Sequence, residues 1–468
     1  MKPLVLGLVL LVGSFSLEAQ CPTQPLVLGS QDAIDDFSAN YPNCTELNVP
    51  VFIDELDGPV DNLNGLIQIE YIESLNIQYT HIQDFTGLDN LAQVSEFRLF
   101  RNNSLLNFNG LQSLVEVTSF NAIQNDVLST SQGLDNLASI EYFNLYQNEQ
   151  LADLNSFTGI TNLVSFRVSG NNFNTLSGFE NLNNVAEEIF ISGESLTNVF
   201  ELSDVLSSFS GVLYFINNTE LSDLSALTNV TNLEKLVIVG SESLTDLSGL
   251  ENLVQVNDLL RIGFNPELIS LEPLMGLTSV GNLDIYENQS LTSLTGFESL
   301  EVIEENFYLM DNPVLDDISA INGLSAQGMN QVVIARNSSL SGCDNDFVCQ
   351  VIFDPEINEE IQGNANGCNS VPQVAARCIL DGSNQMAPFD LKFWPSPADN
   401  IIYVTVGDLA IQSVTIFNAQ GVLMDKTTRV MTQNESMAKF DVSDYASGLY
   451  FIEVGTDSGR VHSKFIKQ

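Results

Sequence analysis

Basic residues and histidine are scarce in this chain of 468 residues. It holds 15 lysines and arginines against 60 aspartates and glutamates, and two histidines, His81 and His462. Residues 21–387 carry seven basic and 50 acidic side chains, whereas residues 388–468 carry seven and nine. This negative charge argues against nucleic acid and anionic membrane surfaces as partners. The uneven distribution also indicates two regions of different character.

The shortage of histidine and of basic residues limits the possible catalytic chemistry. A Ser-His-Asp or Cys-His arrangement in the acidic region would have to use His81 alone. Carboxylates are abundant there, so a pair at glycosidase spacing would arise by chance. A polysaccharide lyase would need a basic residue to abstract a proton, and only seven are available. We therefore predict that the protein is not an enzyme.

Long apolar runs are also missing, except at the N-terminus. Residues 1–20, "MKPLVLGLVLLVGSFSLEAQ", have an early lysine followed by an apolar stretch too short to span a bilayer. We interpret them as a secretory signal peptide. Lipidation of Cys21 is the alternative, but Gln20 stands where a lipoprotein signal has a small residue. No later stretch is long and apolar enough to predict a membrane helix.

Cysteine is absent from the middle of the chain and gathers at the two ends of the acidic region. The six residues are Cys21, Cys44, Cys343, Cys349, Cys368 and Cys378. An even number in an exported chain predicts disulfides. The first two can pair with each other, and the other four allow three connectivities. Zinc is disfavoured because no CxxC spacing occurs and histidine is nearly absent.

A repeat with a step of 23 to 25 residues fills most of the acidic region. Its anchor positions are Asn102, Asn125, Asn148, Asn171, Glu194, Asn218, Ser241, Asn265, Asn288, Asn312 and Asn337, and an earlier, looser coil has Thr80 at this place. Before Asn265, Leu260 and Ile262 alternate as in a strand; after it, leucines recur every third residue from Leu268. A strand followed by short bends satisfies both periods, which predicts a solenoid of about 12 stacked coils.

The anchor asparagines are interpreted as a structural ladder. An asparagine at the end of a strand can bond the backbone groups that the corner leaves unpaired, and the next coil repeats the arrangement. Glycosylation at the Asn-x-Ser/Thr sites Asn102, Asn288 and Asn337 is the alternative, disfavoured because the column recurs without that motif. A second column holds Asp153, Asp223, Asp246 and Asp317. We expect it to be solvated, with calcium as a possible ligand; no other cofactor or metal is predicted.

The repeat pattern, with Gly-Leu-x-x-Leu steps such as "TGLDNL" at 86–91 and "SGLENL" at 248–253, resembles bacterial leucine-rich repeats of the receptor L-domain-like type. The segment from "SGCDNDFVCQ" to "NGCNSVPQVAARC" is similar to the cysteine cap that closes such arrays. The resemblance implies a mainly β solenoid with a parallel sheet. We expect an N-terminal cap at 21–55, the repeats at 56–342 with an irregular coil around 199–209, and a C-terminal cap at 343–380.

A polar linker at 381–388 precedes a region of different composition, residues 389–468. Alternating strands and turns predict a small antiparallel β-sandwich. The motifs "PSPA", "DVSDYASGLY" and the final "KFIK", in this order, resemble the type A sorting domain of the type IX secretion system. This resemblance implies export across an outer membrane, removal of the domain, and surface attachment or release. A generic immunoglobulin-like adhesion domain is the alternative.

Five of the seven basic residues of the acidic region lie on or beside the predicted outer sheet face. Arg98, Arg167 and Arg261 precede an anchor by four residues, and Arg101 and Arg336 precede one directly. The outward columns also carry Phe100, Tyr146, Tyr214, Tyr286 and Tyr308. Exposed aromatics and arginines are typical of a recognition surface, although aromatics also simply favour strands.

The predicted function is therefore that of a secreted or cell-surface adhesion protein that binds an unidentified protein or glycan on the sheet face. The sorting domain would be its contact with the secretion machinery. The alternative is a carbohydrate-active β-helix enzyme, because the coils of such enzymes have similar length.

Overall fold

The structure, a computed structural model, describes residues 21–152, 154–381, 391–395, 397–406, 410–427, 437–456 and 459–468. The predicted signal peptide and residues 382–388 of the predicted linker lie outside these ranges, as does Asp153. The chain divides into two compact units, Met1–Leu163 and Val164–Gln468.

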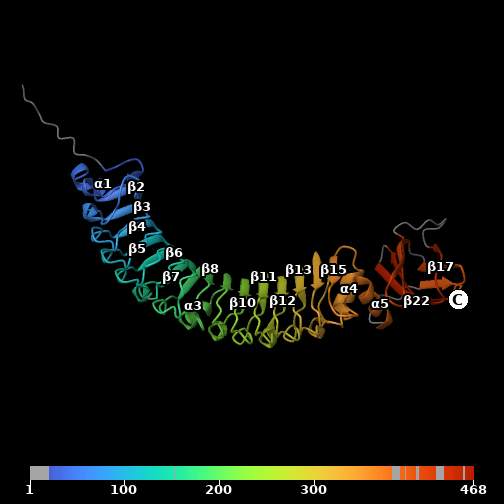
Figure 1. Cartoon of the computed structure of the whole chain (residues 1–468). Helices are drawn as coiled ribbons and strands as arrows, with labels where there is room; N and C mark the ends of the chain where they lie inside the picture. Colours follow the sequence, from blue (N-terminus) through green and yellow to red (C-terminus); the bar gives the residue numbers. More distant parts are fainter. Residues whose placement is uncertain are drawn as a thin grey trace, which may run out of the picture. The chain divides into compact units, whose positions relative to one another are not determined.

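The first unit begins with short elements and continues with long parallel strands (Figure 1). Its elements are β1 (Leu26–Leu28), α1 (Gln31–Asp35), α2 (Phe37–Asn40), β2 (Glu46–Ile53), η1 (Asn64–Leu66), β3 (Tyr71–Gln78), β4 (Gln93–Phe100), β5 (Glu116–Ile123), β6 (Ser139–Tyr146) and η2 (Asn155–Phe157). Strand β7 (Asn162–Ser169) spans the boundary between the units.

The second unit continues the repeats and ends in a separate β domain. Its solenoid elements are β8 (Asn184–Ser192), η3 (Phe200–Leu202), α3 (Ser203–Leu206), β9 (Val212–Ile216), η4 (Ser225–Leu227), β10 (Asn232–Val239), β11 (Gln255–Gly263), η5 (Glu272–Gly276), β12 (Ser279–Tyr286), β13 (Val302–Met310), η6 (Ser319–Ile321), β14 (Gln331–Ala335), α4 (Asp346–Phe353), β15 (Asn358–Gln362) and α5 (Val371–Asp381).

One coil shows why the sequence folds in this way. In β11, Leu260 and Ile262 point inward and are fully buried. Beyond Asn265 the chain returns through turns and the short 3₁₀ helix η5, and the leucines at 268, 271, 274 and 277 are each 0% exposed. A return leg of roughly three residues per turn places every third side chain in the interior. Stacked coils thus share one continuous apolar core.

The strands of the solenoid form a single parallel sheet of 15 described strands, which follow sequence order from β1 to β15. The predicted leucine-rich-repeat architecture is therefore confirmed. The sheet includes β1, β2 and β15, which lie in the segments predicted as caps, so it has more strands than the predicted 12 coils. The irregular coil around 199–209 contains η3 and the short helix α3 in its return leg.

Disulfides link residues at both ends of the solenoid. Cys21 pairs with Cys44, and the four remaining cysteines pair as Cys343–Cys368 and Cys349–Cys378, with Cα–Cα distances between 5.1 and 5.7 Å. The structure thus selects one of the three connectivities that the sequence leaves open. Cys349 lies in α4 and Cys378 in α5, so this bond joins the two helices of the segment predicted as the C-terminal cap.

The C-terminal domain contains two antiparallel sheets. One has the order β16 (Leu391–Trp394), β17 (Ile401–Val406), β20 (Met437–Asp441); the other has the order β19 (Leu423–Thr427), β18 (Ile411–Asn418), β21 (Gly448–Thr456), β22 (Gly459–Lys467). Residues of both sheets, among them Val404 and Ile452, share one buried cluster. This is the predicted small β-sandwich. Among the described residues, no helix has the length and apolar character needed to cross a membrane.

Candidate ligand-binding face

The anchor asparagines lie inside the solenoid and bond the backbone of neighbouring coils. In the second unit, the Asn288 N–H donates to Asn312 Oδ1 at 3.0 Å, and the Asn312 N–H donates to Asn337 Oδ1 at 3.0 Å. The side-chain amides of Asn288 and Asn312 each donate to a strand carbonyl, of Ile262 and Ile285, at 3.1 Å. All three asparagines are 0% exposed. This burial leaves no room for a glycan on Asn288 or Asn337.

The same bonding connects the anchors of the first unit. The Asn102 N–H donates to Asn125 Oδ1 at 3.0 Å, and the Asn125 N–H donates to Asn148 Oδ1 at 3.1 Å. Thr80 begins this row by donating to Asn102 Oδ1. In the second unit the row ends at Asn364, which accepts the Asn337 N–H at 2.9 Å. The repeat pattern does not predict Asn364, because this residue follows Asn337 by 27 residues and the step of the repeat is 23 to 25.

Two of the eleven anchor positions are not asparagine: Glu194 and Ser241. Glu194 accepts the N–H groups of Asn171 and Phe173 at 3.0 and 2.8 Å. Burial raises the pKa of the Glu194 carboxyl, and these hydrogen bonds oppose the rise. Ser241 donates its backbone N–H to Asn265 Oδ1 at 2.9 Å. Its buried Oγ has no hydrogen-bond partner among the described residues.

The residue directly before each anchor turns its side chain out of the corner. In the part of the chain that the structure describes, ten non-glycine residues have a left-handed backbone with φ between 53° and 69°, and most of them are at this position. Those before an anchor include Tyr79, Arg101, Gln124, Gln147, Asn217, Phe264, Glu287, Asp311 and Arg336; Gly170, Gly193, Gly240 and Gly363 occupy it in other coils. A bulky side chain in this conformation is strained. The fold therefore specifies this backbone angle and does not itself favour Tyr, Phe or Arg here.

On the outer sheet face of the first unit, two arginines enclose an aromatic ring. The guanidinium carbons of Arg98 and Arg101 lie 5.5 and 5.1 Å from the Phe100 ring centre. Arg101 Nε donates to Gln124 Oε1 at 2.8 Å, and Tyr79 packs edge-on against Phe100. None of the described ion pairs includes Arg98 or Arg101. Both guanidinium groups can therefore still accept an anionic partner.

Tyr146 lies on the same face of the first unit. The strand register places Phe100 opposite Ile123 and Ile123 opposite Tyr146, so the two aromatic residues are two strands apart in one column. Tyr146 is 40% exposed.

In the second unit, the arginines of the sheet face are paired with carboxylates. Arg167 binds Glu188 and stacks on Phe190, and Arg336 binds Asp311 at 2.6 Å. Arg261 binds Asp284 at 2.7 Å. Burial raises the pKa of the Asp284 carboxyl, and Arg261 opposes this rise.

The predicted tyrosines of the second unit lie on this face and are half-buried. Tyr286 covers Gly263 of the neighbouring strand so closely that a Cβ there would lie 2.5 Å from its ring. Burial raises the pKa of the Tyr286 hydroxyl. Tyr214 packs against Phe190, and the Tyr308 hydroxyl donates to Gln331 at 2.9 Å.

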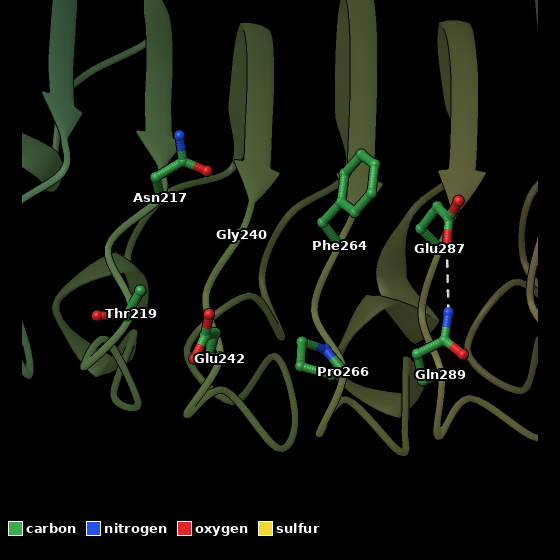
Figure 2. Close-up of a pocket in the computed structure, with 8 residues that line it drawn as sticks. All are labelled: Asn217, Thr219, Gly240, Glu242, Phe264, Pro266, Glu287 and Gln289. Atoms are coloured by element: carbon green, nitrogen blue, oxygen red, sulfur yellow. Dashed lines mark hydrogen bonds between the residues drawn. The ribbon is translucent and has the colours of Figure 1, made fainter.

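A groove of about 630 Å³ runs along the corners that follow β9 to β12 (Figure 2). Four of its residues directly precede consecutive anchors: Asn217, Gly240, Phe264 and Glu287. The four others directly follow those anchors: Thr219, Glu242, Pro266 and Gln289. Figure 2 shows Gly240 without a side chain between Asn217 and Phe264. In the sequence this position stands out only at Arg101 and Arg336, so the repeat pattern does not predict the groove.

The side chains of the aspartate column form turns at the start of the return leg of each coil. Asp223, Asp246 and Asp317 accept the N–H groups of Ser225, Ser248 and Ser319, each at 2.8 Å. The hydrogen bonds from Ser248 lower the pKa of the Asp246 carboxyl. These are turn-forming contacts two residues apart. Within the described ranges, no group of three or more His, Cys, Asp or Glu residues is arranged to hold a metal ion.

Comparisons with known proteins bear mainly on the C-terminal region. The search of curated proteins finds no match. Among solved structures, an internalin (inlF) from Listeria monocytogenes str. 4b F2365 is similar, with 15% identity, 64% of this chain and 88% of that chain covered, and a TM-score of 0.41. Residues 392–468 match the family "Secretion system C-terminal sorting domain". This match confirms the predicted type IX sorting domain, so the chain is a solenoid protein whose C-terminal domain directs it to secretion or the cell surface.

Proposed function

We propose that the protein is a non-catalytic binding or adhesion protein that captures a protein or glycan on the outer face of its sheet. The observation that carries the proposal is the cluster of Arg98, Arg101 and Phe100. Both arginines stand on an exposed face of a region in which acidic residues far outnumber basic ones, and neither has a carboxylate partner among the residues that the structure describes. Arginine and aromatic side chains are the residues on which interfaces most often depend.

The chemistry of the rest of the face supports this proposal. Tyr146 and Tyr286 add rings to the face, and the coils hold their backbones in the sheet. Rigid aromatic side chains lose little conformational entropy when a ligand binds. The single sheet with a return leg of turns and 3₁₀ helices also differs from the β-helix on which the alternative enzymatic function was based.

The test is a glycan and protein array probed with the purified protein, followed by variants. We expect that changing Arg98, Phe100 and Arg101 to alanine abolishes capture of the array ligand, and that changing Tyr146 and Tyr286 to alanine weakens it at least tenfold. Ile269→Ala and Met275→Ala serve as controls, because both residues are 59% exposed and belong to the return leg. Unchanged capture by the folded sheet-face variants would contradict the proposal.

A further inference from the structure

The groove after strands β9 to β12 has an aromatic wall that the fold does not require. Phe264 is 51% exposed and has a φ of 53°. The Tyr286 ring meets it edge-on, with centres 5.3 Å apart and an interplanar angle of 88°. This contact supports one side of the Phe264 ring, and about half of the residue stays exposed. Figure 2 shows the ring among the other residues that line the groove. An exposed ring that packs against a neighbouring ring, on a strained backbone conformation, is more useful to a ligand than to the fold.

Glycine provides the space beside this ring. Gly240 has a φ of 74° and sits between Asn217 and Phe264. A Cβ on Gly240 would lie 2.4 Å from Asn217 Oδ1, so a side chain here would fill the groove and displace the amide. The absence of a side chain on Gly240 therefore leaves open space beside Phe264.

The charges of the groove are all negative. Glu242 and Glu287 line it, and none of its eight lining residues is basic. Neither glutamate takes part in a described ion pair, whereas the nearby cations are already paired: Lys235 with Asp258 at 2.8 Å and Arg261 with Asp284. The acidic solenoid adds a long-range field of the same sign, which attracts cationic groups and repels anionic ones.

We propose that this groove receives an arginine side chain from a basic segment of a partner protein. This inference rests on the proposed binding function. It adds which chemical group of the partner would bind at the corners that follow strands β9 to β12. The planar guanidinium would stack on Phe264 and pair with Glu242 and Glu287, and its methylene stem would lie over Gly240 and Pro266. A guanidinium suits this site better than an ammonium, because it is planar, stacks on aromatic rings and is less strongly hydrated.

The test measures fluorescence polarisation of a dye-labelled peptide that contains three arginines separated by Gly-Ser pairs, in physiological salt. A second peptide carries citrulline, the neutral analogue, in place of each arginine. We expect the arginine peptide to bind and the citrulline peptide to bind at least tenfold more weakly. Phe264→Gly, Glu242→Gln and Gly240→Asn should each weaken binding of the arginine peptide by about three- to tenfold.

Matched controls separate the groove from general charge. Glu267→Gln removes an exposed carboxylate that does not line the groove. Gly193→Asn places the same side chain on the same type of left-handed corner, with φ 65° and its nearest neighbour at 3.6 Å. Both should bind the arginine peptide like the unchanged protein. Circular dichroism of every variant shows whether it is folded.

Three results of the peptide assay would overturn the inference. They are equal binding of both peptides, no binding of the arginine peptide at millimolar concentration, and equal weakening by Glu267→Gln and Glu242→Gln. If the groove instead binds a neutral oligosaccharide, and Gly240→Asn abolishes that binding, the ligand of the groove is a sugar and not an arginine side chain. If the array ligand is lost in the Arg98, Phe100 and Arg101 variant but kept in the groove variants, and these bind the arginine peptide like the unchanged protein, the proposed function stands and this inference fails.

Discussion

Two adjacent rows of residues in each unit have opposite properties. The anchor row is asparagine at nine of the eleven positions from 102 to 337, and its members are buried. The row directly before it holds tyrosine, arginine, glutamine, glycine, asparagine, phenylalanine, glutamate and aspartate on nearly one backbone conformation. The fold therefore requires a particular side chain at the anchor position. At the preceding position it fixes only the backbone angle, so the side chain is free to serve ligand binding.

The difference shows where function can lie in a repeat of this kind. An anchor must satisfy backbone groups of two neighbouring coils at once, and a carboxamide has the donors and the acceptor that this requires. The preceding residue must only tolerate a positive φ, which glycine and asparagine do best. Phe264 and Arg101 occupy that position against the backbone preference. We interpret such residues as the positions available for ligand recognition.

The largest expected effect comes from breaking the anchor row. Asn312→Ala removes an acceptor for the Asn288 N–H and donors to the carbonyls of Ile285 and Met310. Leaving several buried polar groups unpaired should lower the free energy of unfolding by about 3 kcal/mol or more. Urea unfolding measures this loss. Val314→Ala, at an exposed residue close by, is the control and should change stability little; a loss of similar size in both would argue against the ladder.

Restoring the anchor row should have a smaller effect of opposite sign. Ser241→Asn provides an amide like that of Asn265, which donates to the carbonyl of Ile238 at 3.0 Å, and removes a buried hydroxyl without a partner among the described residues. We expect a gain of about 1 kcal/mol. The same unfolding experiment checks it, with Ser243→Asn in the same coil as control. Destabilisation by Ser241→Asn would mean that the smaller side chain is needed there.

The smallest effect concerns Glu194 and depends on pH. Because burial raises its pKa above the ordinary 4.5, the folded protein binds this proton more tightly than the unfolded chain. The stability contributed by Glu194 is therefore fully present at pH values below about 4.5 and is lost as pH rises through the folded pKa. Relative to Glu194→Gln, which does not titrate, the unchanged protein should lose stability as pH rises. A pH-independent difference in unfolding free energy would contradict this assignment.

Much of the fold follows from spacing that is visible in the sequence. Leu260, Ile262 and the leucines from 268 onward define the coil, because burial demands an apolar residue at each inward position. The sorting domain was predicted from short motifs in a fixed order. The four C-terminal cysteines could not be paired from sequence, because their pairing depends on how α4 and α5 pack.

The candidate site was predictable only in part. The columns of Arg98, Phe100 and Tyr146 follow from strand alternation, which assigns each residue to a face. Which arginines are paired depends on the neighbouring coil: Asp284 lies opposite Arg261, whereas Asn76 and Asn121 lie opposite Arg98. The groove at Gly240 is lined by residues from four neighbouring coils. A local sequence pattern cannot predict it, because the open space at Gly240 depends on the side chains of the adjacent coils.

One measurement tests the central claim most directly: urea unfolding of Phe264→Gly and Asn265→Ala, two neighbours in one coil. Our account predicts that Phe264→Gly keeps or slightly raises the free energy of unfolding, because glycine relieves the strained φ of 53°. Asn265→Ala should lower it by about 3 kcal/mol, because buried polar groups lose their partners. If Phe264→Gly destabilises the protein as much as Asn265→Ala, the aromatic residue serves the fold, and the distinction between the two rows fails.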